Sequence, residues 1–166
     1  SLDAKTRWHV LDAQQDGMAQ IERLLTDESE LDTIHIISHG APGTLHLGST
    51  VLTSGNLSEH AQQLQSIGSR LTVTGDILLY GCDVAQGEEG QAFVNALADL
   101  TGADVAASDD LTGGAPTSGN LDLEVRSDQI GSEIAVPMNY PFLLIADTTA
   151  PTLKSLTFPT TIDVSG

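Results

Sequence analysis

Basic residues are scarce in this chain. Its 166 residues include six lysines and arginines against 23 aspartates and glutamates, so the formal net charge is −17. Such a surface repels nucleic-acid phosphates and anionic lipid, and we therefore expect no nucleic-acid partner. It suits an extracellular or high-salt setting and attracts divalent cations weakly, although the acidity can equally serve only to keep the protein soluble.

Long apolar runs are also missing. No run approaches the roughly 18 residues that a membrane span needs, so we expect no membrane insertion. The first ten residues, SLDAKTRWHV, contain no apolar signal-peptide core, and we expect any export signal to lie elsewhere in a longer chain. Hydrophobic residues nevertheless make up 40% of the chain, which indicates one globular domain with its own core.

Cysteine is almost absent. Cys82 is the single one, which excludes an internal disulfide and a cysteine-rich zinc site. The chain also lacks a P-loop, a G-x-G-x-x-G fingerprint, a G-x-S-x-G elbow and a complete EF-hand loop. We therefore expect no cofactor and at most weak calcium binding. A lone cysteine is more often a small buried side chain than a nucleophile, so the residues around Cys82 must show which of the two roles it has.

Apolar patterning alternates between short runs typical of strands and longer stripes typical of helices. The strands are predicted at 8–11, 34–38, 76–80 and 104–107, a hairpin at 45–52, and the helices at 16–25, 57–67 and 88–100. Asn56 and Glu59 have the spacing of a capping box, and Gly102 is a good helix stop. Strands separated by such helices predict βαβ units and a mostly parallel sheet.

The composition changes after Leu111. A loop rich in Gly, Ser, Thr and Pro follows, and residues 121–125 then alternate as in an edge strand. Residues 147–152 (DTTAPT) have the composition of a linker. The segment after them resembles the first strand of the Ig-like repeats of bacterial surface proteins. We therefore expect a domain over 1–145, followed over 146–166 by a linker and the start of an Ig-like β repeat.

His39 and Cys82 each follow a predicted buried strand, and parallel strands carry their active sites at these ends. A thiol peptidase needs a cysteine next to a histidine base, and main-chain N–H groups that hold the oxyanion. Gly40 and Gly81 lie beside the two residues and would let a substrate carbonyl approach the backbone. The helix that starts soon after Cys82 is expected to lower the pKa of the thiol.

These residues carry a resemblance. The segments IHIISHG and ILLYGCDVAQGEEG resemble the His and Cys motifs of clan CD cysteine peptidases, the clan of caspases, metacaspases, gingipains and separase, and above all its CHAT peptidases. The stretch 8–125 is also similar to a domain found near the N-termini of giant bacterial adhesins and of cadherin-like or RTX surface proteins. Two departures stand out: YGCDV is not the caspase pentapeptide, and Tyr80 replaces the metacaspase aspartate.

The resemblance implies an α/β fold, a caspase-like three-layer sandwich with a mostly parallel central sheet and a small β-hairpin extension. It implies a cysteine endopeptidase with His39 as general base and Cys82 as nucleophile, acting on a polypeptide. The setting it implies is extracellular or at a bacterial cell surface, within a larger exported protein. The substrate would be such a protein, its own longer chain included.

The resemblance also places the pocket for the residue before the scissile bond. It implies three contributions, from Asp12, from Tyr80 and from the stretch Ser108-Asp109-Asp110. None of the six basic residues falls there, so charge complementarity favours a substrate with Arg or Lys at this position. The alternative is that these aspartates are ordinary loop and cap residues.

A second hypothesis belongs to another class of function. The domain would then be a non-catalytic caspase-like module that serves assembly or adhesion at one end of a giant adhesin. The residues at positions 39 and 82 are the same in both hypotheses, so the sequence leaves both open.

Overall fold

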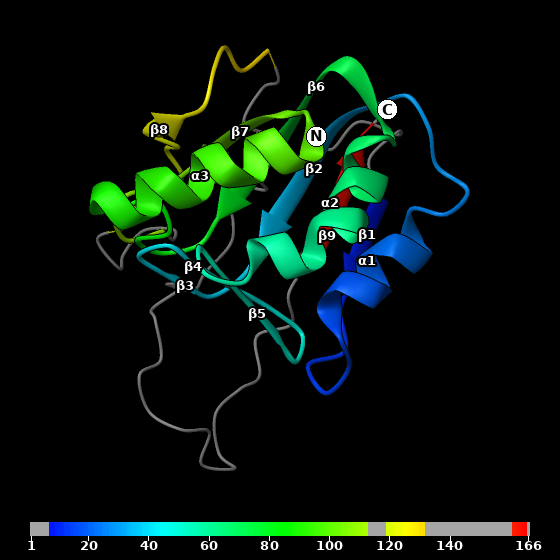
Figure 1. Ribbon diagram of the computed structural model, residues 1–166, viewed down its shortest axis with the longest axis horizontal. Helices are drawn as coiled ribbons and strands as arrows, with labels where there is room; N and C mark the ends of the chain where they lie inside the picture. Colours follow the sequence, from blue (N-terminus) through cyan, green and yellow to red (C-terminus); the bar gives the residue numbers. More distant parts are fainter. Residues whose placement is uncertain (1–6, 113–118, 132–160, 166) are drawn as a thin grey trace.

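The computed structural model describes residues 7–112, 119–131 and 161–165. Its main sheet has six strands in the order β1-β9-β2-β6-β7-β8 (Figure 1). These strands are β1 (Arg7–Val10), β2 (Leu31–Ile37), β6 (Leu71–Tyr80), β7 (Asp104–Ala107), β8 (Val125–Arg126) and β9 (Thr161–Ser165). The central strands β2, β6 and β7 are parallel, whereas β9 and β8 are antiparallel to their neighbours. The predicted α/β class with parallel strands is confirmed.

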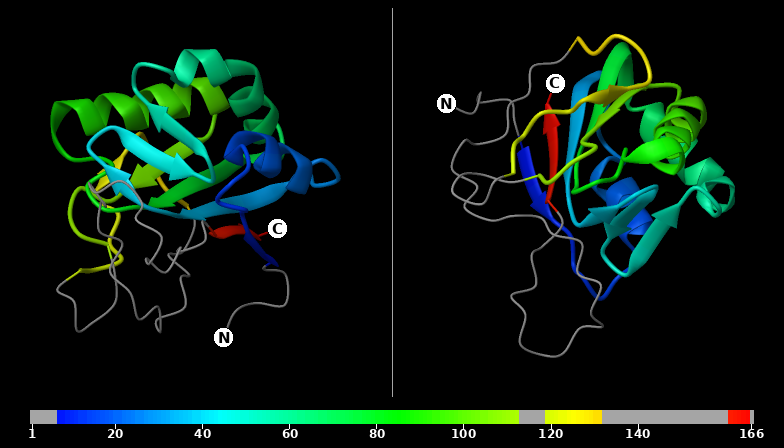
Figure 2. Two further views of the ribbon diagram at one scale, coloured as in Figure 1. Left: turned by 90° about the horizontal axis from the view of Figure 1, so that it is seen from below. Right: turned by 90° about the vertical axis from the view of Figure 1, so that its left-hand side faces the viewer.

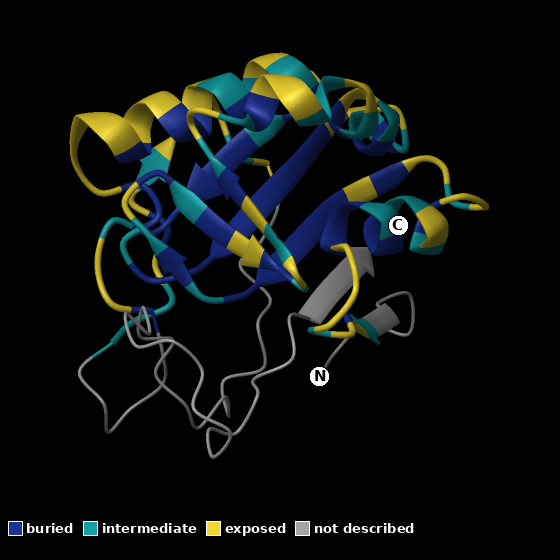
Figure 3. Cartoon of the chain, turned by 60° about the horizontal axis from the view of Figure 1, so that its bottom comes forward, coloured by how far each residue is buried: buried dark blue, intermediate teal, exposed yellow. Residues whose placement is uncertain are grey.

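The three α-helices in the described ranges pack on one face of the sheet. They are α1 (Gly17–Leu24), α2 (Ala61–Gly68) and α3 (Gly87–Thr101), and a 3-10 turn, η1 (Leu57–His60), precedes α2. Their apolar stripes meet the sheet in one core, to which Ile21, Leu64 and Phe93 contribute. Figure 3 shows the result, with the central strands buried and the outer turns of the helices exposed.

The opposite face of the sheet is covered without a helix, as far as the described residues go. A smaller apolar cluster lies there, and Leu121, Leu123 and Ile130 of the extended segment 119–131 pack against it. In the right-hand view of Figure 2 the first part of this segment runs on the side of the sheet away from the helices, and the turn after β8 arches back toward α3. The expected second helical layer of a three-layer sandwich therefore stays a prediction.

Local signals explain where the helices begin and end. Asp16 caps α1, because its carboxylate accepts a hydrogen bond from the Ala19 N–H at 3.1 Å. Gly102 ends α3 in the left-handed conformation, with φ at 71°, as predicted. The capping-box prediction at Asn56 is wrong: its side chain accepts from the Thr53 N–H and donates to the Val51 carbonyl, so it closes the preceding turn instead.

The predicted hairpin is present and is joined by a third strand. Strands β4 (Thr44–Leu47) and β5 (Thr50–Thr53) pair antiparallel, and β3 (Gly40–Ala41) adds to β4 directly after His39. This small sheet packs into the helix-side core through Leu45, Leu47 and Leu52. The loop that carries His39 is thus tied to a rigid element on its C-terminal side.

Two predicted strands differ in extent. Strand β6 begins at Leu71 rather than at Asp76, and its pairing with β2 shifts register between these two residues, which leaves Val73 fully exposed. The edge strand predicted over 121–125 is shorter and later, since only Val125 and Arg126 pair with β7. The residues before them serve as apolar cover for the sheet.

Strand β9 lies within the main sheet, between β1 and β2. Ile162 is the register partner of His9 and Ile36, and Val164 is the partner of Arg7 and Ile34. Residues 146–160 of the predicted linker lie outside the described residues. An Ig-like repeat that starts in this region stays a prediction, while residues 161–165 complete the sheet of the domain itself.

None of the helices in the described part of the chain is long and apolar enough to cross a membrane.

We expect the helix-side core to dominate stability. Phe93 is fully buried between α3 and the sheet, so Phe93→Ala should lower the free energy of unfolding by about 3–5 kcal/mol. The control, Val73→Ala, removes a fully exposed side chain and should change it by less than about 0.5 kcal/mol. Urea unfolding measures both, and similar losses in the two variants would contradict this placement of the core.

Candidate active site

His39 and Cys82 follow neighbouring parallel strands at one edge of the sheet. Ile37 of β2 is in register with Tyr80 of β6, and the Ser38 N–H donates to the Tyr80 carbonyl at 3.1 Å. Each motif residue comes two positions after this aligned pair. The predicted juxtaposition of the two strand ends is therefore confirmed.

The glycines beside the two residues let the backbones of the motifs touch. A Cβ atom added at Gly40 would meet the Val84 side chain and lie 2.9 Å from the Cys82 carbonyl oxygen. One added at Gly81 would lie 3.2 Å from the Ser38 carbonyl oxygen and 3.6 Å from the Gly40 Cα. The contacts at position 40 are shorter than real Cβ atoms make, so glycine is required there. At position 81 a side chain would be tight, and its neighbours would have to shift by a few tenths of an ångström.

Cys82 is buried and faces the main chain of Thr112. Its Sγ accepts the Thr112 N–H at 3.3 Å and donates to the Thr112 carbonyl at 3.7 Å. Burial raises the pKa of the thiol, the Thr112 N–H opposes this, and the Asp83 and Asp110 carboxylates raise it further. The expectation that a helix lowers this pKa is wrong, because α3 begins only at Gly87 and desolvation dominates.

The residue after Cys82 has a strained backbone. Asp83 has φ at 60°, a left-handed conformation that aspartate adopts at a cost. Its N–H donates to the Asp110 carbonyl at 2.9 Å, and its carboxylate accepts from Gln86 at 3.2 Å. Burial raises the pKa of Asp83, and the charges of Asp110 and Asp109 add to this rise. The cysteine turn is thus held against the loop after β7.

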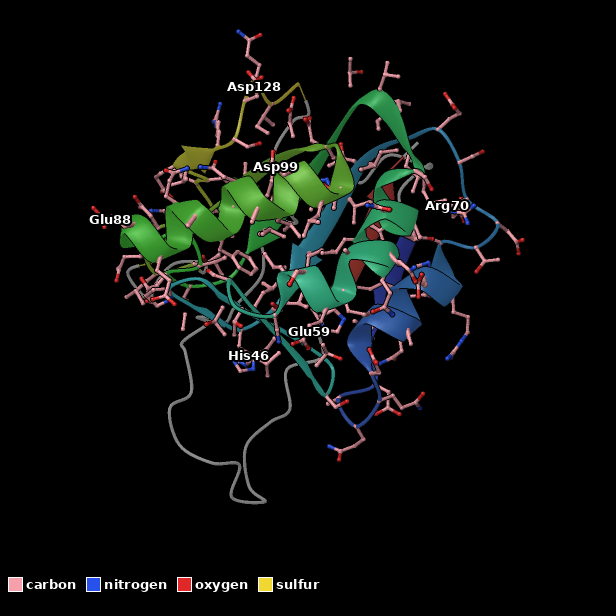
Figure 4. The ribbon with its side chains drawn as sticks, viewed as in Figure 1. His46, Glu59, Arg70, Glu88, Asp99 and Asp128 are labelled. Carbon is pink, nitrogen blue, oxygen red and sulfur yellow. The ribbon has the colours of Figure 1, made fainter. Side chains whose placement is uncertain are left out.

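His39 is half-buried at the end of β2. Its carbonyl accepts the His46 N–H and the Ser38 hydroxyl, each at 3.1 Å. Partial burial lowers the pKa of His46, and the positive charge of a protonated His39 lowers it further. Figure 4 shows His46 on the small hairpin sheet. The imidazole of His39 therefore lies close to a second histidine, although no motif in the sequence links the two residues.

The Ser108-Asp109-Asp110 stretch lies beside the cysteine turn, as expected for pocket residues. The Ala85 N–H donates to the Ser108 carbonyl at 2.9 Å, and Gln86 donates to the Asp109 carbonyl at 3.3 Å. Ser108 is itself buried, and its hydroxyl bonds Asp110. The two aspartates are the members of this stretch that retain solvent contact.

The other two expected pocket residues are engaged in contacts within the domain. Asp12 comes just after β1, which β9 separates from β2, and its carboxylate accepts from the Gln14 N–H at 2.9 Å and from Gln15 at 2.7 Å. This is a loop-closing role, as in the alternative interpretation. Tyr80 is fully buried and stacks on His35, so in this conformation it does not line an open pocket.

The pair formed by His35 and Tyr80 was not anticipated. Their rings stack with centroids 5.8 Å apart, and His35 Nδ1 lies 3.3 Å from the Tyr80 hydroxyl. Burial lowers the pKa of His35 to about 4. The signal in the sequence was positional, since His35 precedes the aligned Ile37 by two residues and so shares its face. The pair thus lies on the same face of the sheet as the apolar cluster that contains Cys82.

Acidic residues gather at the opposite end of β7. An open groove of about 410 Å³ is lined by side chains that include Asp99, Asp104 and Asp128, two of which are labelled in Figure 4. Burial raises the pKa of Asp104, with further contributions from Asp128 and Asp76. No group of three or more His, Cys, Asp or Glu side chains suited to a metal ion occurs in the described ranges.

Comparison with known proteins gives one match. A family model described as Domain of unknown function (DUF4347) matches residues 1–140. No curated protein and no solved structure matches the chain. The matched range includes both strand-end motifs and the segment that covers Cys82, and it ends before β9.

Burial of His35 should make stability depend on pH. The pKa of about 4 in the folded protein lies below the usual 6.5, so the unfolded chain takes up the proton first. The free energy of unfolding should therefore be highest above pH 6.5, where His35 is neutral in both states. It should decrease by about 3 kcal/mol in total as the pH falls from 6.5 toward 4.

The variant His35→Phe keeps a ring against Tyr80 but cannot titrate. Urea unfolding at several pH values should therefore show a flatter dependence between pH 6.5 and 4 than in the wild type. His60→Phe, a change in a histidine outside this pair, is the control. An unchanged slope in His35→Phe would show that His35 is not buried as a neutral ring.

Proposed function

The chain belongs to the DUF4347 family, and we propose that its domain is a caspase-like cysteine endopeptidase in which His39 is the general base and Cys82 the nucleophile. One observation carries the proposal. The two motif residues come from neighbouring parallel strands in matched register, and glycines at both loops let their backbones pack together. That is the arrangement a thiol–imidazole pair requires.

In the proposed reaction His39 accepts the proton of the Cys82 thiol, and the thiolate attacks the carbonyl carbon of the scissile peptide bond. Main-chain N–H groups at Gly40 and at the Gly81–Cys82 turn would hold the oxyanion. His39 then returns the proton to the leaving amine, and water hydrolyses the thioester and regenerates the thiol. No metal or cofactor takes part in these steps.

Charge around the cysteine supports a basic residue before the scissile bond. Asp109 and Asp110 flank the cysteine turn, and the carboxylate of Glu124 accepts the Asp109 N–H at 3.2 Å. A buried lysine or arginine needs a carboxylate partner, because an unpaired charge is costly. The proposed pocket thus uses these two aspartates, since the Asp12 carboxylate is already engaged by Gln14 and Gln15.

The proposed substrate is a large exported bacterial surface protein, including the longer chain to which this domain would belong. The proposed location is the cell surface or its exterior. The net charge of −17 supports attraction of basic polypeptide segments and repulsion of nucleic acid.

One observation favours the second candidate function, a non-catalytic module for assembly or adhesion. Cys82 is fully buried, and its pKa is raised rather than lowered, as for a structural cysteine. The two candidates differ in whether the chain cleaves peptides at all, which an activity measurement decides.

Cleavage should depend on both motif residues. In incubations of the chain with a longer form of the same exported protein, fragments should appear with the wild type and be absent with Cys82→Ala. His39→Ala should slow cleavage by about 10²-fold or more, because the general base is lost. His60→Ala serves as the control histidine. Fragments that persist in Cys82→Ala would reject the endopeptidase proposal in favour of the non-catalytic module.

The residue before the scissile bond should be Arg or Lys. A panel of fluorogenic peptides with Arg, Lys, Asp, Asn or Leu at this position measures the preference through kcat/KM. Asp109→Asn combined with Asp110→Asn should reduce cleavage after Arg and Lys more than cleavage after Leu, while Asp12→Asn should leave the profile unchanged. Preferred cleavage after Asp or Leu by the wild type would refute the basic specificity.

A further inference from the structure

The thiol of Cys82 is engaged by a peptide segment of its own chain. The Thr112 N–H donates to Sγ at 3.3 Å, and Sγ donates to the Thr112 carbonyl at 3.7 Å. Both Cys82 and Thr112 are fully buried, whereas His39 at the neighbouring strand end keeps part of its surface in solvent. The nucleophile is therefore covered, and its partner is not.

The cover is built from two segments that bind each other. The Asn120 N–H donates to the Leu111 carbonyl at 3.0 Å, and its side-chain amide donates to the Asp110 carboxylate at 2.9 Å. Thr112 and Asn120 also form a parallel bridge. Leu123, which is 2% exposed, then packs into the same cluster as Cys82. We define the cover as residues 110–112 and 119–123.

The main chain of Thr112 occupies the place that a substrate must take. A scissile carbonyl has to come within about 3–3.5 Å of the attacking sulfur, and it arrives as part of a polypeptide with its own N–H and C=O groups. Thr112 presents such a pair of groups to Sγ. No substrate peptide can reach the sulfur until Thr112 has moved away from it.

We propose that the cover is an autoinhibitory element in which Thr112 stands in for the substrate's main chain, and this rests on the proposed function for what the cover inhibits. One of the links between its two segments is an amide–carboxylate contact, Asn120 to Asp110. A basic side chain entering the pocket competes for the same carboxylate. Substrates of the proposed class thus loosen the cover as they bind.

The strained backbone of Asp83 also favours displacement of the cover. Its left-handed backbone is held by the hydrogen bond from its N–H to the Asp110 carbonyl, which belongs to the cover. Displacing the cover frees this turn to relax, so the cysteine loop rearranges when the thiol is uncovered. Displacement of the cover and rearrangement of the cysteine loop are therefore coupled.

Alkylation of the intact chain by iodoacetamide tests the cover directly, because Cys82 is the single cysteine. The wild type should react more slowly than a cysteine in a short unstructured peptide at the same pH. Leu123→Ala and Asn120→Ala should each accelerate the reaction about tenfold or more, since tenfold corresponds to only about 1.4 kcal/mol of opening.

Two matched controls separate opening of the cover from general unfolding. Leu97→Ala removes an equally buried leucine from the helix-side core, and Asn95→Ala removes an exposed asparagine from α3. Neither should accelerate alkylation as the cover variants do. A wild type as reactive as the free peptide, cover variants with unchanged rates, or an equal acceleration in Leu97→Ala would overturn the proposal.

The same variants distinguish failure of the cover from failure of the endopeptidase. If Asn120→Ala accelerates alkylation but neither it nor the wild type cleaves peptides, the steric cover of the thiol stands, whereas the proposed activity and the autoinhibitory role fall. If peptides are cleaved at equal rates by the wild type and by both cover variants, the activity stands and the autoinhibitory cover falls. Both proposals are supported if cleavage and alkylation rise together and His39→Ala abolishes the gain in cleavage.

Discussion

The parallel pairing of β2 with β6 is the constraint on which the rest of the site depends. It aligns Ile37 with Tyr80, and the two strands end together, so the loops that follow must pack side by side. That packing requires glycine at position 40, where a Cβ atom would clash with the Val84 side chain and the Cys82 carbonyl. With these loops in place, His39 and Cys82 occupy fixed positions at one edge of the sheet. One face of this sheet packs against the three helices of the described residues.

Beneath these positions the sheet carries polar groups as well as apolar ones. The stacked pair of His35 and Tyr80 lies on the same face as the cluster around Cys82, and a buried neutral imidazole is tolerated there because the tyrosine hydroxyl is within hydrogen-bond distance. The cysteine in turn finds its polar partners in the Thr112 main chain. In the described residues, the face away from the helices is thus closed by the segment 119–131 rather than by a helix, and the buried hydroxyl of Thr112 finds no hydrogen-bond partner there.

Two properties of Cys82 conflict unless its burial is reversible. A strand-end cysteine beside a strand-end histidine indicates a reactive thiol, whereas full burial and neighbouring carboxylates raise its pKa and keep it protonated. An autoinhibitory cover makes both statements compatible, because the raised pKa belongs to the covered conformation. The acidic residues that hold the cover are also the ones that would attract a basic substrate, which couples recognition to opening.

The sequence by itself determined the order and type of most elements, the ends of α1 and α3, and the location of His39 and Cys82 at strand ends. These depend on local patterns, namely apolar periodicity, helix caps and glycine, which act within a few residues of the chain. Only the tertiary structure decided that residues 161–165 enter the sheet between β1 and β2, and so separate Asp12 from the strand that carries His39. It also decided that Cys82 is buried in a cluster with Leu123, and that this burial raises the pKa of the thiol although the Thr112 N–H opposes the rise. Both outcomes arise from contacts between residues some 30 to 150 positions apart, and the free energy of such contacts depends on burial and register that no local pattern encodes.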